Sequence, residues 1–105
     1  MVAGKNERMA GVAAVFRALS NPNRLKVYQQ ICKAADRVKK GITIEQICSA
    51  LKMKQPAVSH HVAGLAAAGL IDRLKDRWWV HCTPSSEALD LLSRFAKDPA
   101  SFDGA

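Results

Sequence analysis

The chain has 105 residues, of which 49% are hydrophobic and 24% are charged, a balance that excludes an intrinsically disordered protein. A chain of this length has room for one hydrophobic core, so we expect a single domain over residues 1–105. Sixteen Lys and Arg residues against nine Asp and Glu residues give a formal net charge of +7. This excess favours a polyanionic partner, with nucleic acid ahead of an anionic membrane surface.

The cysteines and the apolar stretches bear on the cellular compartment. Cys32, Cys48 and Cys82 are odd in number and widely spaced, unlike the disulfide framework of a small secreted domain. The longest mostly apolar stretch, Met9 to Phe16, is far shorter than the roughly 20 residues that a membrane-spanning helix needs. We therefore expect a cytoplasmic protein with free thiols and no membrane partner.

The first part of the chain predicts two helices. Apolar residues recur at intervals of three and four from Asn6 to Leu19, the pattern of an amphipathic helix. Asn21 before Pro22 is a typical N-cap with proline at the first helical position, so a second helix is expected from Pro22 to Ala35. The basic stretch 37–41 then forms a loop.

Two shorter helices are expected next. Thr43 and Gln46 have the spacing of a capping box, which opens a helix that continues to Leu51. After a polar turn over 52–54, Pro56 suits the start of a fourth helix that ends at Gly69, a typical C-terminal cap. Two short helices joined by so tight a turn indicate a helix-turn-helix.

Beyond Leu70 the pattern changes to strand-prone residues in two runs, which predict a hairpin with a charged tip at Lys75–Arg77. Asp76-Arg77 is a poor match to the two-residue turns that require positive φ. Cap residues at 83–86 open a last helix, and a loose tail is expected over 98–105. The expected fold is therefore mainly α with a small β-hairpin (α+β): four helices, the hairpin and a last helix. Excess apolar stripes on the first and last helices indicate a dimer interface.

Several segments together resemble the ArsR/SmtB-type winged helix-turn-helix regulators. They are Ala18-Leu19-Ser20-Asn21-Pro22-Asn23-Arg24-Leu25, Gln55-Pro56-Ala57-Val58-Ser59-His60-His61-Val62, Ala68-Gly69-Leu70-Ile71 and Trp79-Val80. The resemblance implies a symmetric homodimer formed by the first and last helices, with the helix from Gln55 in the major groove of double-stranded DNA and the hairpin, or wing, beside a phosphate backbone. It also implies a transcription regulator, most often a repressor, whose DNA affinity responds to a signal.

The residue types near the fourth helix suit DNA recognition. Lys52 and Lys54 precede the helix N-terminus, which attracts phosphates. Gln55 can bond an adenine edge, Ser59 can donate or accept, and Ala57 offers a methyl group to thymine. The other candidate DNA contacts are His60 in the same helix and three wing residues, Arg73, Lys75 and Arg77. His61, three residues after Val58, is expected instead to be packed and hydrogen-bonded.

Two kinds of effector site can be checked in the sequence: a metal site and a thiol switch. The positions that match the family's Cys-x-Cys-Asp metal motif are Thr43, Glu45 and Gln46, and the segment 85–105 has no His or Cys, so no metal site and no cofactor are expected. Cys32, Cys48 and Cys82 are candidates for a thiol switch, although helical spacing also suits Cys32 and Cys48 as core residues.

Two other classes of function compete with a DNA-binding regulator. A winged-helix module that binds protein would use the positive charge for solubility alone, and only the DNA-binding class requires strong salt dependence. An enzyme is not expected, because the chain has no phosphate loop, and His81 and Cys82, as neighbours in a strand, point to opposite faces.

Overall fold

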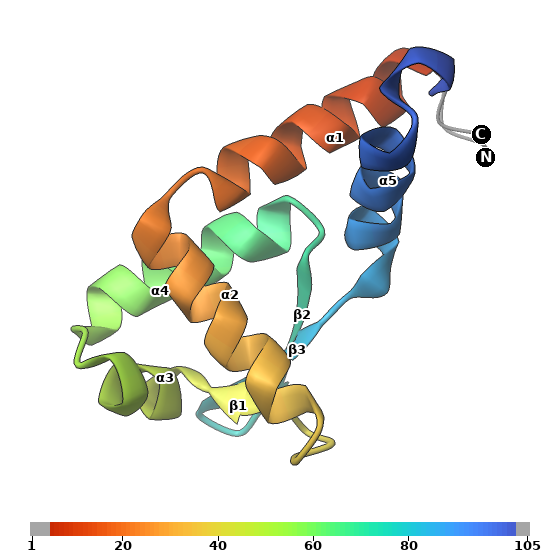
Figure 1. The fold of residues 1–105 in the computed structure, drawn as a ribbon. Coiled ribbons are helices and arrows are strands. Elements are labelled where there is room, and N and C mark those ends of the chain that lie inside the picture. The colour runs from red at the N-terminus through yellow and green to blue at the C-terminus, as the bar shows by residue number, and fades with distance from the viewer. Residues whose placement is uncertain (1–4, 103–105) are drawn as a thin grey trace.

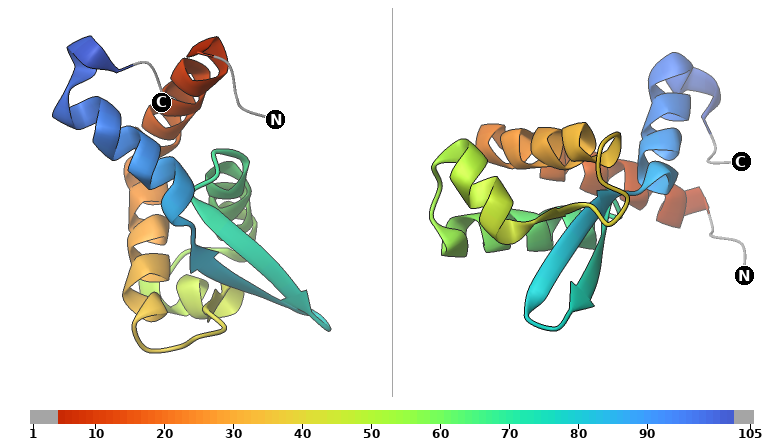
Figure 2. Two further views of the ribbon diagram at one scale, coloured as in Figure 1. Left: turned by 90° about the vertical axis from the view of Figure 1, so that its right-hand side faces the viewer. Right: turned by 90° about the horizontal axis from the view of Figure 1, so that it is seen from below.

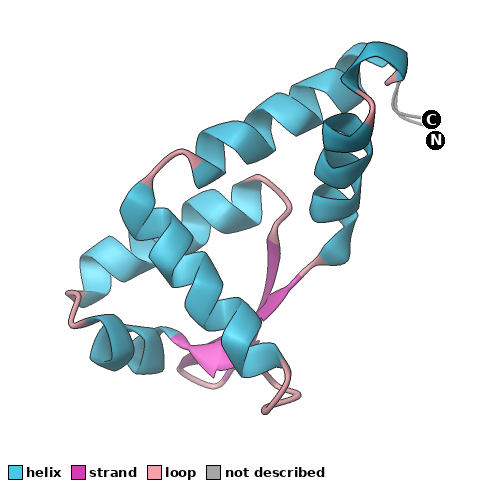
Figure 3. Ribbon diagram, in the orientation of Figure 1, coloured by secondary structure: helices cyan, strands magenta, loops and turns pink. Residues whose placement is uncertain are grey.

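The computed structural model describes residues 5–102 and contains five helices, a three-stranded sheet and a short 3-10 helix (Figure 1). The elements in chain order are α1 (Lys5–Leu19), α2 (Pro22–Ala35), β1 (Ile42–Thr43), α3 (Ile44–Leu51), α4 (Gln55–Ala67), β2 (Ile71–Asp76), β3 (Trp79–Pro84), α5 (Ser86–Lys97) and η1 (Pro99–Ser101). The expected α+β class is confirmed. The expected order of elements omitted β1, which lies between the second and third helices (Figure 3).

Local capping explains where the helices begin and end. The backbone N–H of Arg24 donates to Asn21 Oδ1 at 3.1 Å, which caps α2 as predicted. Both hydrogen bonds of the Thr43–Gln46 capping box form, at 2.9 and 3.2 Å. At the end of α4 the N–H of Leu70 donates to Leu65 O at 3.0 Å, and Gly69 has a φ of +78°. These features form a Schellman motif. The motif requires a residue in the left-handed region just after the helix, a conformation that glycine adopts readily.

The sheet joins β1 to the hairpin in the order β1-β3-β2, with all pairs antiparallel. Ile42 pairs with Cys82, and Thr43 pairs with His81. Gly41 makes this pairing possible, because its φ is +91° and an added Cβ would lie 2.1 Å from the carbonyl oxygen of Cys82. Strand β1 was not predicted from the sequence, because two residues are too few to show a strand period.

One core unites helices α1 to α4 with the base of the hairpin. Its fully buried members include Val15, Val27, Ile31, Ile47, Val58, Val62, Leu65, Leu70 and Cys82. From this core β2 and β3 project as a wing, on the side of the molecule away from α2 (Figure 2). Helices α1 and α5 lie side by side at the other end of the molecule, where Phe95 packs edge-on against Phe16 at 6.1 Å.

The segment from Asp98, expected as a loose tail, begins with ordered structure. Asp98 caps η1 by accepting a hydrogen bond from Ser101, and Phe102 packs on Phe95 with ring centroids 5.4 Å apart. Residues 103–105 lie outside the described residues.

Candidate nucleic-acid interface

The turn between α3 and α4 depends on one residue in an unusual conformation. Lys52 has φ 55° and ψ 42°, the left-handed region, and its own N–H donates to Cys48 O. The next N–H, that of Met53, donates to the same carbonyl at 3.1 Å. This closure reverses the chain at once after α3, so α4 begins at Gln55 and packs against α3.

Helix α4 has a buried face and an exposed face, as its spacing predicted. Val58, Val62 and Leu65 are at most 1% exposed and hold the helix in the core. Pro56 and His60 are exposed on the opposite side. Because the core fixes the rotation of α4 about its axis, the side chains on its free face are presented in a defined direction.

The free N-terminal end of α4 is the most basic part of this helix pair. Lys52, Lys54, Gln55 and Ala57 are all exposed, and Ser59 is half-buried. Lys54 is the N-cap but makes no side-chain cap hydrogen bond, in contrast to the caps of α2 and α3. Pro56 has no N–H and the N–H of Ala57 donates to Lys54 O at 3.1 Å, so this helix end attracts an anion through its positive dipole end and the N–H of Gln55.

Arg24 on α2 packs against α4 on the side away from the free face, a role that was not predicted from the sequence. Its guanidinium lies against Gly64, where an added Cβ would be 3.1 Å from Nε, and Nη1 donates to Ala18 O at 3.4 Å. Gly64 was expected on the exposed face of α4, but it is half-buried beneath this side chain. The spacing of residues in α4 could not reveal a cover supplied by another helix.

His61 is packed, as expected, with an exposed fraction of only 8%. Desolvation lowers its pKa, and the nearby positive charges of Arg24 and His60 lower it further. Its Nδ1 is buried and has no hydrogen-bond partner among residues 5–102, so the expected hydrogen bond is not found at that atom. His61 therefore belongs to the core side of α4, whereas His60 faces solvent.

The wing turns one residue later than the sequence indicated. Asp76 pairs with Trp79, so the two-residue turn is Arg77-Trp78 and not the expected tip at Lys75–Arg77. Arg77 has a φ of +60°, which a two-residue hairpin turn requires and which Arg adopts at some cost. Trp78 is 75% exposed. The three basic candidates, Arg73, Lys75 and Arg77, are all exposed.

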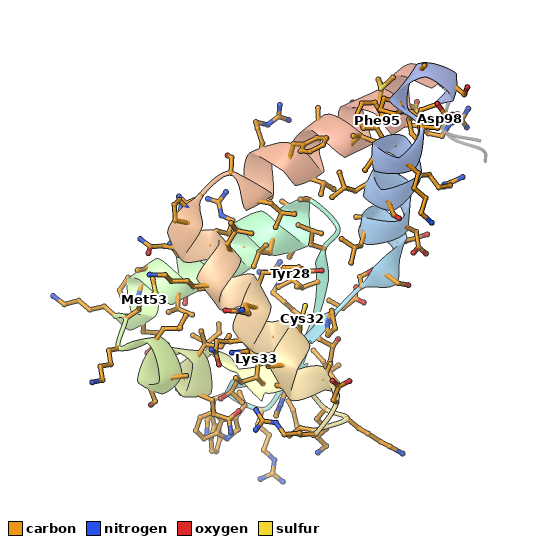
Figure 4. All side chains as sticks on the ribbon, in the orientation of Figure 1. Tyr28, Cys32, Lys33, Met53, Phe95 and Asp98 are labelled. Carbon is orange, nitrogen blue, oxygen red and sulfur yellow. The ribbon has the colours of Figure 1, made fainter. Side chains whose placement is uncertain are left out.

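All three cysteines are free thiols, and their surroundings differ. Burial raises the pKa of Cys82 to about 11, so this thiol stays protonated near neutral pH. Cys32 and Cys48 are half-buried. Cys32 lies one turn after Tyr28 on α2 (Figure 4), and burial together with the Cys32 hydrogen bond raises the pKa of Tyr28 to about 12.

Within residues 5–102, no three His, Cys, Asp or Glu side chains gather as ligands for a metal ion. Over the same residues, no helix combines the length and apolar character needed to cross a membrane.

In space, α4 and the wing project on the same side of the molecule, opposite α2 (Figure 2). The two elements that carry most of the exposed candidates therefore project on one side of the molecule. A helix and a projecting hairpin on one side form the two-part surface with which winged helices engage a major groove and the adjacent backbone.

Comparison with known proteins places the chain in a family. Residues 19–73, from the end of α1 to β2, match the family model described as a helix-turn-helix domain. YbzH of Bacillus subtilis (strain 168), named as an HTH-type transcriptional regulator, is 30% identical over 92 residues, which cover 79% of this chain and 92% of YbzH.

Two solved structures have the same fold. An ArsR-like transcriptional regulator from Rhodococcus sp. RHA1 superposes with a TM-score of 0.71 at 20% identity, covering 90% of this chain and 85% of the other. MepR of S. aureus, solved as a complex with DNA, has a TM-score of 0.56 at 17% identity, covering 81% of this chain and 72% of MepR. The chain thus belongs to the helix-turn-helix family of DNA-binding transcriptional regulators and has the winged fold of its ArsR-type members.

Proposed function

We propose that this chain acts in the cytoplasm as a homodimeric repressor, with a DNA-binding and not a catalytic role, and that two copies of α4 enter successive major grooves of an operator. The single observation that carries the proposal is the N-terminal end of α4, where exposed Lys52, Lys54 and Gln55 adjoin a helix anchored in the core. The solved complex of MepR with DNA, which has the same fold, supports a duplex as the partner.

The roles of the candidate residues follow from their chemistry. Gln55 carries an amide that can pair with an adenine edge, so we assign it to base recognition, with Ser59, Ala57 and His60 beside it. Lys52 and Lys54 are assigned to phosphates, which position the protein without reading sequence. Arg73, Lys75 and Arg77 are assigned to the backbone beside the wing.

The dimer is proposed to form through α1 and α5. Phe16 and Met9 on α1 are 50% and 41% exposed, and Leu89 on α5 is 42% exposed. Such a concentration of large apolar side chains at one end of a small protein is typical of a surface that another molecule covers. A symmetric dimer would set the two α4 helices roughly 34 Å apart, one turn of DNA.

Fluorescence anisotropy with the full chain and the duplex upstream of its own gene, against a random duplex at two salt concentrations, tests the proposal. We expect sequence-selective binding whose affinity falls steeply with salt, because phosphate contacts release counterions. Gln55→Ala should reduce the preference for the specific duplex, whereas Lys54→Ala should weaken binding to both duplexes. Lys33→Ala, on α2 and so on the opposite side of the molecule, is the matched control and should change neither.

Two results would contradict the proposal. Equal affinity for specific and random duplex would remove the sequence-specific regulator, and a flat salt dependence would leave a winged helix that binds protein. A chain that binds DNA selectively as a monomer would refute the dimer alone.

A further inference from the structure

An open cavity of about 710 Å³ lies between α3 and strand β3, apart from the exposed face of α4. Its size is within the range of small-molecule sites, roughly 300 to 1,000 Å³. Helix α3 lines it with Glu45, Ser49 and Ala50, and β3 lines it with Trp79 and His81. None of the residue assignments in the proposed DNA interface uses these side chains.

The register of the sheet explains why these strand residues line the cavity. Successive strand residues point to opposite faces, so Trp79 and His81 share one face while Cys82 points into the core. Thr43, paired with His81, extends the same face on β1 and also lines the cavity. The cavity therefore lies between this face of the sheet and the face of α3 that carries Glu45, Ser49 and Ala50.

Two polar atoms of the lining residues are buried without a partner. Glu45 Oε1 and His81 Nδ1 have no hydrogen bond to any residue in the described range 5–102. Buried polar atoms are normally satisfied by protein, water or ligand, since an unmet hydrogen bond leaves the cost of desolvating the atom uncompensated. Since Oε1 is shielded from solvent, a molecule in this cavity that donates hydrogen bonds satisfies the Glu45 carboxylate when that side chain rotates toward the cavity.

The charge and the aromatic surface of the cavity define the class of ligand. Glu45 contributes the carboxylate among the lining residues, whereas Asp76, on the same face of the hairpin, does not line the cavity and is ion-paired with Lys40 at 3.8 Å. The Glu45 carboxylate repels phosphate, although the chain as a whole has a net charge of +7. Trp79 is 43% exposed and offers an indole surface, to which cations are attracted.

We propose that this cavity is an effector site for a small aromatic cation, a flat ring bearing an amidinium, guanidinium or amine group. The ring would lie against Trp79 and Ala50, and the cationic N–H groups would donate to Glu45. The assignment as an effector site rests on the proposed DNA-binding function, because α3 belongs to the helix-turn-helix and β3 belongs to the wing. A ligand that contacts both elements fixes the distance between α3 and β3. It thereby lowers the affinity for DNA, because the wing and α4 must adjust to fit the duplex together.

Ligand binding is tested first, in the absence of DNA, with benzamidine as the cationic probe. Two-dimensional ¹H–¹⁵N spectra report the two indole N–H groups separately, and Trp78→Phe assigns them. We expect benzamidine to shift the Trp79 signal saturably and to leave the Trp78 signal almost unchanged, because only Trp79 lines the cavity. Benzoate, which has the same shape and the opposite charge, should produce no saturable shift.

Variants then test the residues. Glu45→Gln keeps the shape of the side chain and should weaken benzamidine binding about tenfold, since it replaces a charged hydrogen bond by a neutral one. Glu87→Gln on α5, outside the cavity, is the matched control and should leave the affinity unchanged. Equal binding of benzoate, or unchanged affinity in a folded Glu45→Gln protein, would overturn the proposed ligand class.

The effector role is tested separately by anisotropy. Saturating benzamidine should weaken binding of the wild-type chain to its upstream duplex at least threefold, roughly 0.65 kcal/mol, and should have no such effect on Glu45→Gln. If benzamidine binds at Trp79 but DNA affinity does not change, the effector role is wrong while the ligand site stands. If the chain does not bind DNA selectively at all, the proposed function fails, and the spectra without DNA still decide whether the cavity is a ligand site.

Discussion

Replacement of Lys52 by glycine separates the conformational role of this residue from its charge. At φ 55° and ψ 42°, Lys52 is in the left-handed region, which costs a non-glycine residue roughly 1–2 kcal/mol. Glycine relieves this strain but loses more backbone entropy on folding, by roughly 0.5–1 kcal/mol. The expected net gain in the free energy of unfolding for Lys52→Gly is about 0.5–1 kcal/mol.

The matched variant is Lys52→Ala, which removes the same charge but keeps a side chain in the left-handed region. Because its strain is unchanged, its midpoint of thermal unfolding should stay close to that of the wild type. Lys52→Gly should melt higher by about 3–6 °C, as roughly 1 kcal/mol shifts the midpoint of a domain this size by about 4–8 °C. Circular dichroism melts of the three proteins measure the difference.

The same two variants should behave alike toward DNA. If each Lys52 of a dimer contacts one phosphate, two contacts are lost, and the slope of log K against log salt should fall by about 1.8 in magnitude. Anisotropy at several salt concentrations gives the slopes. Should Lys52→Gly melt at or below the temperature of Lys52→Ala, the account of strain in the turn would be refuted. An unchanged salt slope in both variants would refute the phosphate contact instead.

Three further predictions concern the sheet, the core thiol and the dimer. Gly41→Ala should lower the free energy of unfolding by about 2–4 kcal/mol in urea titrations, because its Cβ would clash with the Cys82 carbonyl and its φ is +91°; a loss below 1 kcal/mol would contradict this close approach. Iodoacetamide at pH 8 should modify Cys32 and Cys48 before Cys82, as followed by mass spectrometry, since burial raises the Cys82 pKa from the ordinary 9.0 to about 11. Burial of the neutral Cys82 thiol should contribute fully to the free energy of unfolding below pH 9, and this contribution should be lost as the pH rises toward 11. Phe16→Asp should elute as a monomer in size-exclusion chromatography, whereas dimer elution would show that α1 is not the interface.

Much of the local structure follows from short-range patterns in the sequence. Asn21 before Pro22, the Thr43–Gln46 box and Gly69 each cap a helix because their partners lie within a few residues. The spacing of Val58, Val62 and Leu65 likewise determines which face of α4 is buried. The segment Gln55–Val62, which carries part of the family resemblance, could be recognised for the same reason, because it lies in one continuous helix.

Features that depend on residues distant in the chain were decided only by the tertiary structure. Strand β1 exists because Ile42 and Thr43 pair with Cys82 and His81, some 40 positions away, and its own two residues show no period. The turn at Arg77-Trp78 follows from the pairing of Asp76 with Trp79, which overrides the turn preference of the residues themselves.

The cavity beside α3 and the contact of Arg24 with α4 both arise where elements from different parts of the chain pack together. Arg24 covers Gly64 from another helix, and Glu45 meets Trp79 and His81 only after the sheet has brought β3 beside α3. A helix period or a strand period describes which face of one element is apolar. It does not say which neighbouring element will cover that face or leave a cavity beside it, because that depends on how all the elements pack around the shared core.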